Sequence, residues 1–328
     1  MDKKTLILNS AEVEHLINMG EALQAVRDAF FLHGKNLVTM PTKIYLHLDK
    51  YGGDFRAMPA YIASREACGI KWVNVHPKNR RFGFASVMAL IILSDPATGF
   101  PLCIMDGTLI TNLRTGAAGG LAARYLAKKD SRTIGLVGCG AQAKTQLLAL
   151  RELFKIKSVY VWGNKLIYAK KFLKDLKYLG LDMEIKEDIS GCVKEADIVV
   201  TATPSRIPIV QAGWIKEGTH INAIGADAKG KEELAPQLVR KAKIVVDDVC
   251  QACHSGEINV PISRKLFRKE NIYATLGEIV AGKKRGRESE KEITIFDSTG
   301  LAIQDIAVAN LVYKKALKAK SGKWIKLL

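Results

Sequence analysis

The chain has 328 residues, 48% of them hydrophobic, which allows about two compact domains with buried cores and excludes a disordered or fibrous protein. No apolar run reaches the roughly 18 residues of a membrane span, and the N-terminus does not resemble a secretory signal, so we expect a cytoplasmic protein without a membrane partner. The net charge of +17 could attract nucleic acid, but basic and acidic residues are interleaved and no nucleic-acid-binding motif is present, so we expect no nucleic-acid partner. The charge instead indicates a solvated lysine-rich surface or the attraction of anionic substrates and cofactors.

The first hundred residues predict an α+β region. Ser10 is a candidate cap for a helix with acids in its first turn, and the apolar spacing continues to about His33. Gly52 and Gly53 separate two alternating runs, which predicts a hairpin. Residues 5–8 lead into the first helix, and strands are expected at 43–49, 55–63, 69–77, 86–95 and, after a turn, within 96–107. The continuous apolar run at 86–95 is typical of a central strand.

Beyond Leu109, small residues recur at helical spacing to about residue 127, and strands then alternate with helices. Such alternation is the signature of a parallel doubly wound sheet. Strands are expected at 133–138, 158–163, 196–203, 219–225 and 242–248, and helices at 141–153, 166–179 and 232–242. A charged run at 283–292 precedes the segment 293–319, which ends in an amphipathic helix that we expect to pack on the first region. The sequence therefore predicts an α/β protein with a Rossmann-type domain and an α+β domain.

The strand at 133–138 leads into Gly138-Cys139-Gly140-Ala141-Gln142-Ala143, a GxGxxA motif between a strand and a helix. Gly138 allows the tight turn, Gly140 lets the backbone approach a pyrophosphate, and Ala143 permits close helix packing. The first turn of the helix offers N–H groups to that pyrophosphate. The motif therefore predicts an NAD or NADP site.

The second strand of such a domain usually ends in an acid that binds the adenine ribose hydroxyls. Here the strand is followed by Gly163, Asn164 and Lys165, without an acid. Asn164 and Lys165 are candidates to receive a ribose 2′-phosphate, which would favour NADP or mixed use. The alternative is that Lys165 opens the next helix in solvent.

Six cysteines are too sparse for a disulfide scaffold in a chain of this length. Cys250 and Cys253 form a CxxC motif followed by His254, but no second ligand pair follows at zinc-finger spacing. We expect reduced, partly buried thiols and no metal site.

Four basic residues in strand or strand-end settings are candidates to hold a small anionic substrate: Lys43, Arg56, Lys71 and Arg114. Lys71 lies inside an apolar strand, where a lysine is costly unless it is paired. Asp227 follows the strand at 219–225, at the carboxyl edge where ligands bind in such sheets. It could exchange protons with an amine, or it could be a turn residue or helix cap.

Several longer stretches resemble the ornithine cyclodeaminase/mu-crystallin family, and most of all its archaeal alanine dehydrogenase branch. They are RAMPAY at 56–61, KWVNVHPKN at 71–79, TNLRTGAAGG at 111–120, GCGAQA at 138–143, IGADAKGKEEL at 224–234 and GRESEKEITIFDSTGLAIQD at 286–305. The resemblance covers most of the chain and is far more specific than the glycine motif alone.

The resemblance implies a homodimer of two-domain subunits. Residues 1–117 and 300–328 would form the substrate-binding and dimerisation domain, and 118–299 the Rossmann domain. Lys71 would contact the substrate carboxylate, Asp227 would donate or accept the proton, and Thr299 would face the substrate. The residues expected to line the cofactor are Ser86, Arg114, Ala141, Gln142, Thr201, Ile221, Asn222, Ala223, Ile224, Lys231 and Ser298.

Two positions depart from the ornithine cyclodeaminase pattern. That enzyme has a glutamate for the distal amine of ornithine where this chain has Arg56, and an aspartate for the ribose near Gly163. Lys43 together with Arg56 resembles the alanine dehydrogenase arrangement, in which two cations face a small 2-oxo acid.

We therefore expect reversible reductive amination, with alanine, pyruvate and ammonia as the reactants. Lys71, Arg56 and Lys43 would hold the carboxylate and polarise the 2-oxo group, while Asp227 relays protons at the nitrogen and hydride passes between Cα and nicotinamide C4. Arg114 would bridge the cofactor phosphate and the site. The alternatives are an ornithine cyclodeaminase, a reductase of cyclic imines such as pyrroline-2-carboxylate, and a nucleotide-binding protein without catalysis.

Overall fold

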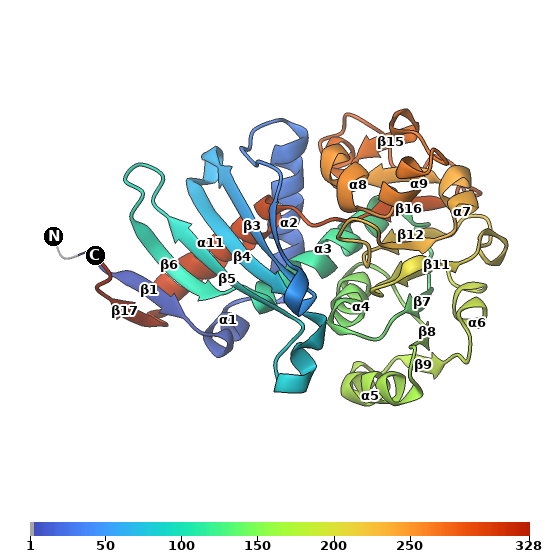
Figure 1. The fold of residues 1–328 in the computed structure, drawn as a ribbon, viewed down its shortest axis with the longest axis horizontal. Helices are drawn as coiled ribbons and strands as arrows, with labels where there is room; N and C mark the ends of the chain where they lie inside the picture. The colour runs from blue at the N-terminus through green and yellow to red at the C-terminus, as the bar shows by residue number, and fades with distance from the viewer. Residues whose placement is uncertain (1–2) are drawn as a thin grey trace. The chain divides into compact units, whose positions relative to one another are not determined.

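The computed structural model describes residues 3–328 and divides into two compact units (Figure 1). The first unit is drawn from Met1–Arg114 together with Leu301–Leu328, and the second from Thr115–Gly300. The chain passes from one unit to the other inside a helix at Arg114 and again after Gly300.

The first unit is built on a seven-stranded mixed sheet. In sheet order its strands are β17 (Lys323–Ile325), β1 (Thr5–Leu8), β6 (Pro101–Asp106), β5 (Val87–Ser94), β4 (Ala67–Val75), β3 (Gly53–Ile62) and β2 (Ile44–Leu48). The strand β5 lies in the middle, as its continuous apolar run predicts. The expected hairpin around Gly52 and Gly53 is the antiparallel pair of β2 and β3.

The inner face of this sheet is covered by helices. The C-terminal helix α11 (Ala302–Ala319) packs on β3, β4 and β5 and beside α2 (Met19–Gly34), as its amphipathic pattern predicts (Figure 1). Buried residues alternate with more exposed ones along β3, because successive side chains in a strand point to opposite faces. The helix α11 therefore ties the end of the chain to the N-terminal strands.

The first helical segment differs from the prediction in two respects. It is two helices, α1 (Ser10–Leu16) and α2, and the N-cap of the first is Asn9 rather than Ser10. Asn9 and Asn18 each accept a hydrogen bond from the N–H of a glutamate three residues later, and that glutamate side chain bonds back to the cap. These repeated capping boxes start a new helix at Met19 and interrupt the apolar spacing.

The second unit holds an eight-stranded parallel sheet. In sheet order its strands are β15 (Ile272–Thr275), β14 (Lys243–Val246), β16 (Thr294–Asp297), β12 (His220–Ala223), β10 (Ile198–Thr201), β7 (Thr133–Val137), β8 (Ser158–Trp162) and β9 (Asp182–Ile185). The chain leaves β7 toward β8 and β9, then returns to β10 on the other side. The doubly wound prediction is therefore confirmed, with the switch point between β7 and β10.

Three strands of this sheet were not predicted. The strands β9 and β15 are short strands at the two edges of the sheet. The strand β16, which comes after the charged segment at 283–292 in the chain, lies inside the sheet between β12 and β14. The segment itself is anchored, since Lys243 pairs with Glu288 and Glu292, and Arg287 donates to the Leu126 carbonyl.

The helices of the second unit lie between its strands in the chain. The helix α4 (Ala141–Leu153) has the predicted bounds, and α5 (Leu166–Leu176) covers most of the predicted range. The segment predicted as a helix at 232–242 is wrong in its first part: residues 232–234 form β13, paired with β11 (Arg206–Val210), and only α7 (Pro236–Lys241) is helical. Pro236 sits in the first turn, where a missing N–H costs nothing.

The small residues after Leu109 form α3 (Thr108–Leu126), and they let it approach α4 closely. A Cβ at Gly116 would run into the carbonyl of Thr145, and one at Gly119 into the side chain of Gln146. The carbonyls of α3 are held by the same neighbours, since Gln146 donates to the Thr115 carbonyl and Asn222 to the Gly119 carbonyl. Among residues 3–328, no helix is long and apolar enough to cross a membrane.

Candidate active site

Lys71 is the most deeply buried cation among the predicted site residues. It lies in the middle of β4, opposite Met58 and Ile91, on the face of the sheet that α11 covers. Its side chain is fully buried, and its Nζ lies 2.7 Å from Oδ2 of Asp305 in α11. The expectation that a lysine at this position needs a partner is thus met by a helix at the other end of the chain.

Arg114 meets the same carboxylate. Its Nε lies 3.0 Å from Oδ1 of Asp305, and its Nη1 donates to Gln304 Oε1 at 3.0 Å. Asp305 is itself fully buried, so the two cations share one carboxylate away from water. Arg114 therefore contacts α11, and its role as a bridge between the cofactor phosphate and the site stays a prediction.

The surroundings lower the pKa of Lys71 to about 7. Burial is the largest cause, because it disfavours the charged form, and Arg114 and Lys43 add repulsion. Asp305 opposes them and keeps the pKa from falling further. Near neutral pH the Lys71 ammonium can therefore lose its proton, and an anion bound beside it would restore the charge.

Asp305 is the functional candidate that sequence reasoning missed. It stands on the otherwise apolar face of α11, between the buried Ile303 and Ile306. A charged residue on the buried face of a terminal helix, in a chain with a lysine inside a strand, is the signal that could have found it.

Arg56 pairs with a carboxylate, Asp54, that was not predicted. Its Nε lies 2.8 Å from Oδ1 of Asp54, two residues earlier in β3, and its guanidinium lies over the ring of Tyr45. Lys43 approaches the same ring, with its Nζ 5.9 Å from the centroid. Both cations are nearly buried, but the charge of Arg56 is balanced by Asp54.

The glycine motif lies at the carboxyl edge of the parallel sheet, beside the switch point. Gly138 has φ +111°, and a Cβ there would come within 2.6 Å of the Ala202 carbonyl, so only glycine fits. Gly140 is the N-cap of α4 without a side-chain cap bond, and no atom lies within 4 Å of where its Cβ would be. An open approach to the first turn of α4 is what a dinucleotide pyrophosphate needs.

Other predicted cofactor residues gather at the ends of neighbouring strands. Those in the second unit are Ala141 and Gln142 in α4, Thr201 in β10, Ile221, Asn222 and Ala223 in β12, Ile224 just after it, and Ser298 after β16. The side chains of Ile221 and Asn222 face the interior, where Asn222 bonds to His220 and Gln146. Ser86, which precedes β5, belongs to the first unit.

Ser298 supplies a buried polar atom at the carboxyl edge of the parallel sheet. Among residues 3–328, its hydroxyl finds no hydrogen-bond partner although the residue is only 3% exposed. Its N–H donates to the Ala223 carbonyl, which fixes it at the edge of the sheet. The glycine loop and this hydroxyl together fit a nicotinamide dinucleotide. The neighbouring Thr299, predicted to face substrate, donates to Asp247 at 2.9 Å.

Asp227 lies in the loop that follows β12, where it pairs with Lys231 at 2.6 Å. Both ends of this loop are fixed. Glu233 accepts from the N–H groups of Thr203 and Gly225. The side chain of Asn259 accepts from the Gly230 N–H and donates to the Lys231 carbonyl. The loop thus presents an oriented carboxylate beside the strand ends.

Glu233 is joined by a second buried acid, Glu257, which accepts from the Glu233 and Leu234 N–H groups. Burial and the charge of Glu233 raise the pKa of Glu257 well above its usual value. Sequence reasoning assigned neither acid a role, since each is separated from its partners by loops.

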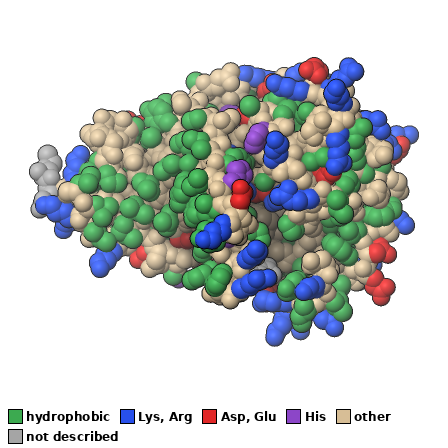
Figure 2. Space-filling model, viewed as in Figure 1, with side chains coloured by type: hydrophobic (Ala, Val, Ile, Leu, Met, Phe, Trp, Pro, Cys, Tyr) green, Lys and Arg blue, Asp and Glu red, His purple; other side chains and the backbone are tan. Residues whose placement is uncertain are grey.

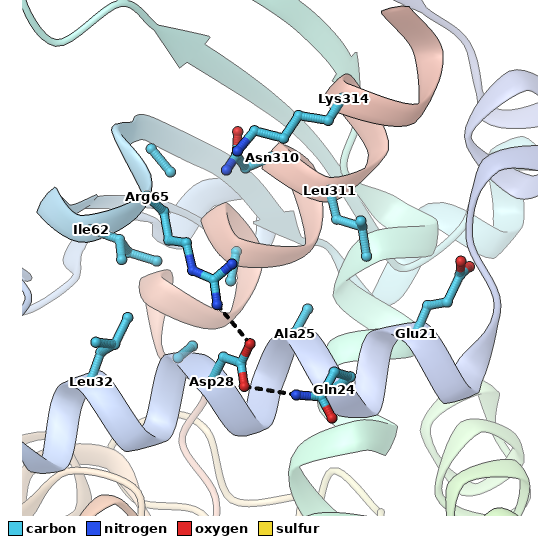
Figure 3. Close-up of a pocket in the computed structure, with 13 residues that line it drawn as sticks. Glu21, Gln24, Ala25, Asp28, Leu32, Ile62, Arg65, Asn310, Leu311 and Lys314 are labelled. Atoms are coloured by element: carbon cyan, nitrogen blue, oxygen red, sulfur yellow. Dashed lines mark hydrogen bonds and ion pairs between the residues drawn. The ribbon is translucent and has the colours of Figure 1, made fainter. Parts of the chain in front are cut away.

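Two further features of the described residues concern ligands. No group of three or more histidine, cysteine or acidic side chains within 3–328 is arranged to hold a metal ion, and Cys250 and Cys253 are free thiols in the short helix α8 (Val249–Ser255). A pocket of about 340 Å³ opens between α2, α11 and the turn at 63–65, where Asp28 accepts hydrogen bonds from Arg65 and Gln24 (Figure 3). It contains no predicted site residue.

Comparison with known proteins identifies relatives along the whole chain. Residues 3–320 match the model of the ornithine cyclodeaminase/mu-crystallin family. An alanine dehydrogenase of Archaeoglobus fulgidus is 53% identical over 98% of both chains. The solved structure of an archaeal alanine dehydrogenase dimer with bound NAD is 52% identical over 99% of this chain and 100% of that one, with a TM-score of 0.95.

A second solved structure carries a different activity. The Δ1-pyrroline-2-carboxylate reductase of Thermococcus litoralis, in complex with NADH and L-proline, is 40% identical over 97% of this chain and 99% of that one, with a TM-score of 0.95. Both the family match over nearly the whole length and these identities lead to one conclusion: the chain belongs to the ornithine cyclodeaminase/mu-crystallin family.

Proposed function

We propose that this protein is an NAD(P)-dependent amino-acid dehydrogenase that interconverts L-alanine with pyruvate and ammonia. The observation that carries the proposal is the buried cationic cluster around Lys71. The charges that set the pKa of Lys71 are two cations, Arg114 and Lys43, and one carboxylate, Asp305, so a substrate carboxylate would balance the excess. The similarity to alanine dehydrogenases supports the same reading.

In this proposal Lys71 binds the carboxylate of pyruvate and polarises its 2-oxo group. Reduction consumes pyruvate, an ammonium ion, a proton and the reduced dinucleotide, and yields alanine, water and the oxidised dinucleotide. The dinucleotide supplies the hydride that forms the new C–H bond at Cα. Asp227 exchanges the protons at nitrogen, and Lys231 orients its carboxylate.

The two units divide this work in the proposal. The unit with the Lys71 cluster binds substrate, and the unit with the glycine loop binds the dinucleotide, with Ser298 and the first turn of α4 as contacts. Binding and catalysis should therefore be separable by mutation.

The assay follows absorbance of the reduced nicotinamide with pyruvate and ammonia, and with alanine in reverse. Oxidation of the cofactor that needs both pyruvate and ammonia supports the proposal, and no oxidation contradicts it. Lys71→Ala and Asp227→Asn should each abolish turnover while dinucleotide affinity changes little. Loss of dinucleotide affinity in both variants would remove these residues from the proposed roles.

A cyclic imine reductase is the second candidate, because a relative with NADH and L-proline is 40% identical. L-Proline carries the same carboxylate that the Lys71 cluster would hold. Cofactor oxidation by pyrroline-2-carboxylate without added ammonia, at a higher kcat/KM than with pyruvate, would favour this candidate.

An ornithine cyclodeaminase remains separable by its lack of net redox change. Arg56 would repel a substrate amine less strongly than the sequence suggests, because its charge is balanced by Asp54 at 2.8 Å. Formation of proline from ornithine with no net absorbance change would decide for that activity.

We also propose that the protein is a homodimer that buries the outer face of the seven-stranded sheet. Ile44, Trp72 and Leu90 stand in one row across β2, β4 and β5, on the face opposite Lys71. They are 67%, 41% and 54% exposed, and Leu46 on the same face is 52% exposed. Hydrophobic side chains gather over these strands (Figure 2). An apolar row of this kind on a sheet is typical of a protein interface.

A further inference from the structure

The end of β8 lies directly beside the glycine loop. The Gly138 N–H donates to the Trp162 carbonyl at 2.9 Å, and a Cβ on Gly163 would come within 2.6 Å of Cys139 Sγ. In a doubly wound sheet, the end of the second strand meets the adenosine ribose. The residues after Trp162 therefore face the part of the dinucleotide that differs between NAD and NADP.

This edge lacks the acid that would bind the ribose hydroxyls. Residues 163–168 read Gly-Asn-Lys-Leu-Ile-Tyr. An aspartate at Gly163 would collide with Cys139 unless that side chain moved. In the neighbouring strand β9, Glu184 pairs with Lys186, which lies just after the strand. Asp188 caps the next helix, α6 (Ile189–Val193), by accepting from the Gly191 N–H. These two acids are thus already engaged.

Lys165 offers a positive charge that the protein does not use. It is exposed, it is the N-cap of α5, and its side chain makes no cap bond. Among residues 3–328, it makes no ion pair with a carboxylate, in contrast to Lys186 just after the neighbouring strand. Asn164, also exposed, adds amide donors next to it.

We propose that Asn164 and Lys165 bind a phosphate on the 2′-oxygen of the adenosine ribose, so that the protein binds NADPH at least as tightly as NADH. The inference rests on the dinucleotide site of the proposed function and adds the choice of cofactor. A phosphate meets a charge-assisted donor in Lys165, whereas a free ribose hydroxyl finds no acid.

Direct binding tests this choice without turnover. NADPH and NADH are titrated separately into the full chain by calorimetry, and adenosine 2′,5′-bisphosphate is compared with 5′-AMP. The Lys165→Gln variant should raise the Kd of NADPH about tenfold or more and change that of NADH less than twofold. Asn164→Asp should shift the preference toward NADH, because a carboxylate there repels phosphate and accepts from ribose hydroxyls.

The matched control is Lys170→Gln, which removes an exposed lysine of the same helix that has no ion pair among residues 3–328. It should leave both affinities unchanged. NADPH binding weaker than NADH in the unaltered chain, or an equal effect of Lys165→Gln on both dinucleotides, would overturn the inference and leave the dinucleotide site intact. No binding of either dinucleotide would instead refute the proposed function.

Discussion

Replacing Lys71 with methionine should change how the stability of the protein depends on pH. The pKa of Lys71 is lowered from 10.5 to about 7, a difference worth roughly 5 kcal/mol against the charged form at about 1.4 kcal/mol per unit. Between pH 7 and 10.5 the unfolded chain holds a proton that the folded chain has lost. The stability of the unaltered protein therefore rises with pH through this window, and the full cost is present below pH 7.

Lys71→Met removes this cost, and Asp305 keeps Arg114 as a partner at 3.0 Å. The free energy of unfolding of the variant, minus that of the unaltered protein, should be most positive at pH 6. It should then fall by up to about 1.4 kcal/mol per pH unit from pH 7 to pH 10. The absolute difference also includes altered packing, so the slope is the diagnostic quantity.

The assay is urea unfolding at pH 6, 7, 8 and 9 at one protein concentration, with linear extrapolation to water. The exposed lysine variant Lys170→Met serves as the control and should give a difference that varies little with pH. A difference for Lys71→Met that is equally flat would refute the reasoning, because burial could not then be the main cause of the lowered pKa.

Asp305→Asn removes the carboxylate that supports the charge of Lys71, so the KM for pyruvate should rise about tenfold or more at pH 8 and less at pH 6, measured with saturating dinucleotide. Glu257→Gln should match the stability of the unaltered protein near pH 4.5 and exceed it toward pH 8 in urea unfolding. The reason is that the pKa of Glu257 is higher in the folded than in the unfolded chain, so ionising this carboxyl costs stability as pH rises; a difference in stability that does not vary with pH would contradict this. Gly138→Ala should lower Tm, since φ +111° and the Ala202 carbonyl exclude a Cβ, at a cost of about 1–3 kcal/mol. Trp72→Glu should give monomers in light scattering after size-exclusion chromatography, and an unchanged mass would place the interface elsewhere.

Features that depend on neighbouring residues could be predicted from the sequence. The GxGxxA motif fixed the start of α4 at Ala141, because tight turns and helix starts need particular residue types a few positions apart. The apolar run at 86–95 identified the central strand of its sheet, although only one face of β5 is buried and Leu90 on the other face is 54% exposed. The burial of Lys71 was inferred the same way, from its setting in an apolar strand.

Other features depended on which distant segments meet. The strand at 232–234 forms because this segment pairs with β11. The choice of Asn9 over Ser10 as the cap is local instead, since Asn9 forms a capping box with Glu12.

The identity of the charges around the site needed the tertiary structure most. Periodicity places Lys71 inside, but it does not say that Asp305, near the other end of the chain, returns on α11 to meet it. Periodicity likewise does not show that the charge of Arg56 is balanced by Asp54. The sequence by itself thus determined the fold class and the residue types available for chemistry. Only the packing of α11 on the sheet decided their pairing, because electrostatic energies depend on distance and burial rather than on position in the chain.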